Sequence, residues 1–125
     1  MSNMKKLILY ILLYINIISM AGCTNNSRFS GSKTSNENQF LVDFGLLNTT
    51  VNSKMFLSEG ETIEATIDVQ KGDVDIIVKN ENGTIAYQGN DEEACKYIIK
   101  IEEEGTYTFY VSGAKAKGSV YFIKS

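Results

Sequence analysis

Hydrophobic and polar residues alternate with a period of two along much of the second half of the chain. Residues 62–69 place Ile63, Ala65 and Ile67 on one side and polar residues on the other, and residues 73–79 repeat the pattern. Alternation over four to eight residues is typical of half-buried β-strands. The pattern therefore predicts strands that pack one face on a core and expose the other to solvent.

Other segments fit the same architecture. Asn82-Gly83 is a strong hairpin signal, because both residues accept positive φ angles. The apolar segment 40–47 fits either an edge strand or a short helical turn, and the loop 89–93 fits one helical turn capped by Asn90. Further strand-like runs cover residues 49–57, 84–88, 95–101, 106–111 and 117–124. We therefore predict an all-β fold, an antiparallel, jelly-roll-like β-sandwich of about seven to eight strands, with a small barrel as the alternative.

The first 22 residues differ from the rest of the chain. Lys5 and Lys6 precede the apolar run 7–20, which only Asn16 and Ser19 interrupt. This run is shorter than the roughly 20 apolar residues that a transmembrane helix needs, and it suits the hydrophobic region of a secretory signal. An uncleaved signal anchor is the alternative.

The residues Met20-Ala21-Gly22-Cys23 resemble the lipobox of bacterial lipoprotein signal peptides, with Met20 where the family prefers Leu. The resemblance implies cleavage between Gly22 and Cys23. It also implies a diacylglyceryl thioether on Cys23 and acylation of the freed amine, for example by palmitate. We therefore expect a protein that is lipid-anchored in the bilayer of the cell membrane, on its extracytoplasmic face.

This signal divides the chain into three parts. Residues 1–22 form the signal peptide, residues 23–39 comprise the lipidated cysteine and a polar segment that reads as a flexible tether, and residues 40–125 form the sandwich domain. A polar tether of this length spans on the order of 20 Å.

Composition narrows the possible functions. Without Lys5 and Lys6, ten basic residues stand against 15 acidic ones, so the mature part has a net charge of −5, which does not favour nucleic acid. The chain has no histidine, which removes the usual general base and the commonest zinc ligand. Cys95 is the only other cysteine, and its phase matches Tyr97 and Ile99, so we expect it to be buried.

Three stretches within residues 54–124 resemble the bacterial pre-peptidase C-terminal domain, a small β-sandwich. They are 72–76 (GDVDI), the Asn82-Gly83 hairpin and 105–111 (GTYTFYV). The resemblance implies the fold and a non-catalytic binding or accessory role. Some similar domains bind calcium at acidic loops.

Two groups of residues are candidate sites. Asp73, Asp75 and Asp91 offer the hard oxygen ligands that Ca²⁺ prefers, although solvated acidic turns would look the same. We expect no other cofactor. Three residues fall out of phase with the expected core and could form an exposed binding face or simple cross-strand pairs: Ile98, Tyr110 and Tyr121.

Three functions fit these observations. We expect a non-enzymatic binding or accessory module for a glycan, a peptide or an envelope protein. The alternatives are a structural or protective envelope protein that partners another membrane protein and, with less support, a hydrolase that uses carboxylates alone.

Overall fold

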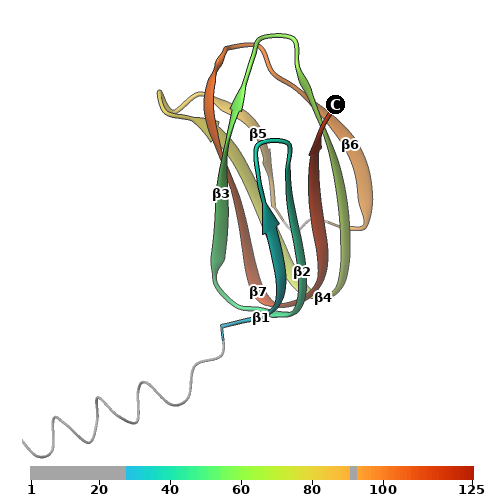
Figure 1. Ribbon diagram of the computed structural model, residues 1–125. Coiled ribbons are helices and arrows are strands. Elements are labelled where there is room, and N and C mark those ends of the chain that lie inside the picture. The colour runs from blue at the N-terminus through green and yellow to red at the C-terminus, as the bar shows by residue number, and fades with distance from the viewer. Residues whose placement is uncertain (1–27, 91–92) are drawn as a thin grey trace, which may run out of the picture.

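The computed structural model describes residues 28–90 and 93–125, which form seven antiparallel β-strands. Figure 1 shows these strands folded into two layers. Among the described residues no helix is present, and hence none that could cross a membrane. The strands are β1 (Phe29–Ser35), β2 (Gln39–Leu47), β3 (Thr50–Leu57), β4 (Thr62–Asn80), β5 (Ile85–Gly89), β6 (Cys95–Lys100) and β7 (Gly105–Lys124).

Two long strands, β4 and β7, run through both layers. The first half of β4 pairs with the second half of β7, and the second half of β4 pairs with the first half of β7. One layer has the strand order β1-β2-β7-β4-β6, and the other has the order β3-β7-β4-β5. We call them the five-stranded and four-stranded layers. The hydrogen-bonded ladder is therefore continuous, although it folds into two layers (Figure 1).

The turn from one layer to the other is made where β4 and β7 bend together. Gly72 has a φ of +72° and Lys115 a φ of +48°, and the pairing register of β4 shifts on either side of Lys71. A Cβ atom on Gly72 would lie 2.4 Å from the carbonyl oxygen of Lys115. Only glycine fits this position, because it has no Cβ and accepts positive φ.

The core lies between the two layers and is built from the inward residues of each. Phe109 and Phe122 meet there, with ring centroids 4.9 Å apart, and Phe122 also stacks with Phe40. Ser53 and Asn80 are the polar residues among the buried ones described. The Oδ1 atom of Asn80 accepts hydrogen bonds from the backbone N–H groups of Asn82 and Thr84 in the β4–β5 turn. This buried oxygen therefore has hydrogen-bond partners within the protein.

The two ends of the sandwich differ. One end, the bend end, holds the start of β1, the β2–β3 turn and the bends of β4 and β7. The other, the turn end, holds the β1–β2, β3–β4, β4–β5 and β6–β7 turns and the C-terminus. Figure 1 shows the start of β1 at the bottom and the C-terminus at the top.

The predicted fold class is confirmed, because the chain forms an all-β antiparallel sandwich. Segment 40–47 is a strand and not a helical turn, and it lies between β1 and β7 inside a layer. The runs 62–69 and 73–79 belong to one strand, β4, and the runs 106–111 and 117–124 belong to one strand, β7.

Two expectations need correction. Residues 29–35, which the polar sequence assigned to the flexible tether, form β1 and pair with β2. Almost all side chains of β1 are exposed, so its sequence does not alternate between apolar and polar residues.

Cys95 is exposed and not buried. It begins β6 at the open edge of a layer, whereas Ile99, which has the same phase, is buried further along the strand.

Candidate functional site

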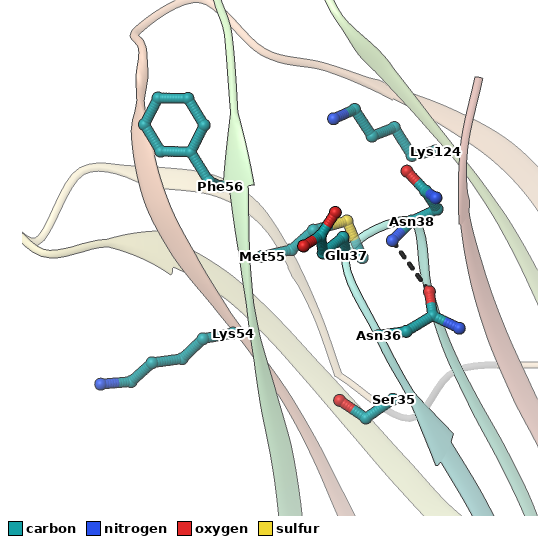
Figure 2. A pocket seen from close by; sticks show the side chains of 8 residues that line it. All are labelled: Ser35, Asn36, Glu37, Asn38, Lys54, Met55, Phe56 and Lys124. Carbon is teal, nitrogen blue, oxygen red and sulfur yellow. Dashed lines mark hydrogen bonds between the residues drawn. The ribbon is translucent and has the colours of Figure 1, made fainter.

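The larger of two described pockets lies at the turn end, where the edge strands β1 and β3 approach each other. It has a volume of about 550 Å³ and is lined by Ser35, Asn36, Glu37, Asn38, Lys54, Met55, Phe56 and Lys124. Figure 2 shows Lys54 and Phe56 pointing to one side of β3 and Met55 to the other, toward Glu37. The pocket therefore has an apolar floor at the buried Met55 and a polar wall formed by the β1–β2 turn.

Local hydrogen bonds shape this wall. The Asn36 Oδ1 atom accepts from the backbone N–H groups of Asn38 (2.9 Å) and Gln39 (3.1 Å), which closes the turn (Figure 2 shows the first of these bonds). The hydroxyl groups of Ser35 and Ser53 are hydrogen-bonded, which ties the end of β1 to β3. The β1–β2 turn is thus held against the second layer by a side-chain contact across the gap between the two edges.

The charged side chains that line this pocket are Glu37, Lys54 and Lys124, and they do not supply the acid and base that hydrolysis by carboxylates uses. Lys124 Nζ lies 3.1 Å from Glu61 Oε2, just outside the pocket. A hydrogen bond from the Ser58 N–H to Glu61 Oε1 (2.7 Å), followed by the contact with Lys124, lowers the pKa of the Glu61 carboxyl below its ordinary value. Glu37 is the one carboxylate among the lining residues, whereas glycoside hydrolysis uses two.

A second pocket of about 420 Å³ also lies at the turn end. It is lined by Thr84, Ile85, Ala86, Lys100, Glu102, Glu103 and Tyr107. Glu103 accepts hydrogen bonds from the Asn82 amide and the Thr84 hydroxyl, both at 3.3 Å, and its carbonyl oxygen accepts one from the Tyr107 hydroxyl. The Glu103 carboxylate therefore connects the β6–β7 turn to the β4–β5 turn. The bond from the Tyr107 hydroxyl to the backbone four residues upstream resembles the tyrosine corner of other sandwiches.

The predicted binding face is split between the two layers. Ile98 and Tyr121 lie on the outer face of the five-stranded layer, where each neighbours β4. Tyr110 precedes the bend of β7 and lies on the outer face of the four-stranded layer, opposite Asn52 and Ile77. Ile98, Tyr110 and Tyr121 therefore do not form one exposed binding face, because β7 passes through both layers and presents Tyr110 and Tyr121 on opposite sides of the molecule.

Tyr121 has a specific partner on its own face. Its hydroxyl donates a hydrogen bond of 2.5 Å to Asp43 Oδ1 on the neighbouring strand β2. This bond favours the protonated phenol, so it raises the pKa of Tyr121 above the ordinary value. The contact joins two strands of the five-stranded layer, and it uses the Tyr121 hydroxyl proton in a hydrogen bond to the Asp43 carboxylate.

The proposed calcium ligands are only partly described. Asp73 and Asp75 are both exposed on β4 beside its bend, opposite Ala114 and Ser112 respectively. Asp91 lies outside the described residues, as do Gly22 and Cys23 of the lipobox. Residues 91–92, in the middle of the helical turn predicted within the loop 89–93, also lie outside them. Within residues 28–90 and 93–125 no three carboxylate or cysteine groups gather closely enough to hold a metal ion.

Two lysines that the sequence reading did not single out share the outer face with Tyr110. Lys54 and Lys79 both lie opposite Thr108, on either side of it, and Lys79 Nζ lies 5.4 Å from the centroid of the Tyr110 ring. Both lysines are out of phase with the buried residues of their strands, and this phase was the feature of the sequence that could have placed them on an outer face. What the sequence could not show is that β7 brings β3 and β4 to either side of Tyr110.

No family model matches the chain, and no curated protein matches its sequence. Among solved structures, the chain is similar to the pre-peptidase C-terminal domain of a collagenase from Bacillus anthracis, with 14% identity, a TM-score of 0.49, and coverage of 81% of this chain and 100% of that one. That domain is of the kind that the sequence resembles.

Two further solved structures are similar to the chain. One is PliG from Aeromonas hydrophila, a periplasmic inhibitor of g-type lysozyme, with 13% identity, a TM-score of 0.47, and coverage of 77% and 89% of the two chains. The other is described as CBM4, with 7% identity, a TM-score of 0.41, and coverage of 79% and 77%. At these scores the fold assignment rests on the strand pairing of this chain itself.

Proposed function

We propose that the protein is a lipoprotein anchored in the cell membrane through Cys23, and that its sandwich acts on the extracytoplasmic face as a non-catalytic binding or accessory module. The lipobox layout of residues 20–23 supports the anchor. Two acyl chains would bury many methylene groups at about 0.8 kcal/mol each, so dual acylation gives stable attachment where one chain is marginal.

The lipobox layout is the observation that carries the anchor, and the position of β1 adds which end of the sandwich such an anchor would hold near the bilayer. Phe29 opens β1 at the bend end of the sandwich, six residues after Cys23 in the sequence. Six extended residues span at most about 20 Å. An anchor at Cys23 would hold the bend end near the bilayer, and the turn end, which carries the C-terminus, would then face away from the lipid (Figure 1). Both pockets lie at the turn end and would face away as well.

The chemistry of the pockets supports binding over catalysis. The chain lacks histidine, and the larger pocket combines amide and hydroxyl groups with one carboxylate. The second pocket is lined by two carboxylates, Glu102 and Glu103, but both oxygens of Glu103 already accept hydrogen bonds from the adjacent turn. The larger pocket therefore lacks a second carboxylate, and in the second pocket one of the two is held by the turn and not free to act on a substrate, whereas hydrolysis by carboxylates requires a paired acid and base.

The anchor is tested by metabolic labelling with an alkyne analogue of palmitate in a bacterium that processes lipoproteins. We expect label on the wild-type protein and on the Cys95→Ser variant, which keeps Cys23, and no label on Cys23→Ser. Labelling of Cys23→Ser, or a wild-type protein without label, would overturn the proposed anchor.

A further inference from the structure

The outer face of the four-stranded layer contains two neighbouring rows of side chains without a carboxylate. The six residues alternate with buried neighbours on their strands, so all of them point away from the core. One row is Lys54, Thr108 and Lys79, and the next is Asn52, Tyr110 and Ile77. We call these six residues the lysine face.

The charge of this face is opposite to that of the chain. The mature part has a net charge of −5, whereas the lysine face carries two ammonium groups, and Asp75 lies in the row beyond it. On the other side of the molecule Lys96 is paired with Glu64 at 2.7 Å. Among residues 28–90 and 93–125, neither Lys54 nor Lys79 takes part in an ion pair. Both are therefore available to an anionic partner.

One of the two ammonium groups is positioned by an aromatic ring. Lys79 Nζ lies 5.4 Å from the centroid of Tyr110, within the range of a cation–π contact. This contact holds the ammonium group above the face and reduces the conformational freedom that a ligand must restrict on binding. Lys54 lies two strands away, which places the two backbone positions roughly 10 Å apart, given a strand spacing of about 4.8 Å.

The remaining groups favour a glycan over a peptide. The backbone of β7 is paired with β3 on one side and β4 on the other, so the centre of the lysine face has no open ladder to which a peptide strand could add. Recognition must come from side chains. The Thr108 hydroxyl and the Asn52 amide both donate and accept hydrogen bonds, which suits the hydroxyl groups of a sugar.

We propose that the lysine face binds an anionic polysaccharide, whose carboxylate or phosphate groups pair with Lys54 and Lys79 and whose hydroxyl groups meet Thr108 and Asn52. This inference rests on the proposed function, since it assigns a ligand class to the proposed binding module. It does not depend on how the module is attached to the membrane.

Isothermal titration calorimetry on the detergent-solubilised wild-type protein tests the inference, with polygalacturonate and phosphorylated dextran as anionic probes and neutral dextran and poly-glutamate as comparisons. We expect an anionic polysaccharide to bind more tightly than either comparison, and the affinity to fall with added salt. The Lys54→Gln/Lys79→Gln variant should lose about tenfold or more in affinity, as two exposed charge contacts allow.

The matched control is Lys33→Gln/Lys96→Gln, which removes the same charge from exposed positions on β1 and β6 of the opposite layer and should retain wild-type affinity. Lys54→Arg/Lys79→Arg keeps both charges and should also bind the anionic polysaccharide. Binding by this variant would show that the Gln variant loses affinity because it lacks the charges, and not because substitution at these positions unfolds the domain. Equal losses in the two Gln variants, absence of binding to both anionic polysaccharides, or tighter binding of poly-glutamate would overturn the inference. Palmitate labelling of Cys23 reports on the anchor separately, so the two failures are distinguishable.

Discussion

Phe109 and Phe122 belong to the same strand, β7, yet their ring centroids lie 4.9 Å apart across the core. This contact exists because β7 bends beside β4 and passes from one layer of the sandwich to the other. Aromatic pairs of this kind stabilise a core beyond the area that they bury. The bend therefore determines both how the core is closed and which residues share an outer face.

The bend should be sensitive to substitution at Gly72. Gly72→Ala combines a positive φ with a Cβ atom 2.4 Å from the Lys115 carbonyl oxygen, and we expect a loss of about 3 kcal/mol or more in the free energy of unfolding. Gly83→Ala is the matched control, because Gly83 also has a positive φ but has open space around the Cβ position. It should cost only about 1 kcal/mol. Urea denaturation measures both, and equal losses would contradict the steric account of the bend.

The Tyr107 hydroxyl should contribute measurably to stability. It donates a hydrogen bond to the Glu103 carbonyl oxygen from a buried position. We expect Tyr107→Phe to lower the free energy of unfolding by about 1 kcal/mol. Tyr110→Phe removes a hydroxyl from the outer face of the same strand and should change stability little. A Tyr107→Phe protein as stable as the wild type would show that this corner is dispensable.

Glu61 makes stability depend on pH in the acidic range. Its carboxyl has a lowered pKa in the folded protein, so the folded state favours the ionised form. The resulting stabilisation is complete above the ordinary value of 4.5 and is lost as pH falls through the lower folded pKa.

Glu61→Gln isolates this effect, because it keeps the shape of the side chain and removes the charge that pairs with Lys124. In urea denaturation at several pH values, the wild type should be more stable than the variant near pH 7. The difference should shrink steadily below about pH 4.5. A difference that stays constant down to pH 3 would rule out the carboxylate as its source.

Tyr121 should titrate at a higher pH than an ordinary tyrosine side chain. The hydrogen bond to Asp43 raises its pKa, so the folded state favours the protonated phenol. This contribution to stability is complete below the ordinary pKa of 10.0 and is lost as pH rises through the folded value. NMR titration of ¹³C-labelled tyrosine measures the pKa directly, and Asp43→Asn should lower it. An unchanged Tyr121 pKa in that variant would refute the assigned cause.

Local alternation was sufficient to predict the strands that bury one face. It identified the inward residues of β4 and β7, since Val74 and Phe109 keep the same phase as their buried neighbours. It failed for β1, whose two faces are both exposed, so that its sequence carries no period of two. Alternation placed Cys95 in the same phase as the buried residues of β6 but wrongly predicted that Cys95 is buried. The phase of a residue does not show whether it lies at the edge of a layer, where the core no longer covers it.

The candidate sites depend on pairing between distant strands, which a local pattern does not contain. Tyr110 and Tyr121 were both correctly placed outside the core, but the bend between them puts them on opposite sides of the molecule. Lys54 and Lys79 are 25 positions apart in the sequence and flank Thr108 only because β7 separates β3 from β4. The sequence thus indicates which side chains face outward, and the fold decides which of them form a surface together.

The most direct test of the proposed membrane anchor is the intact mass of the mature protein purified from the membranes of a lipoprotein-processing bacterium. We predict a chain that begins at Cys23, lacks residues 1–22 and carries the added mass of a diacylglyceryl group, with or without a further acyl chain on the amine. A protein that retains residues 1–22, or one that begins at Cys23 without added lipid mass, would contradict the proposed function.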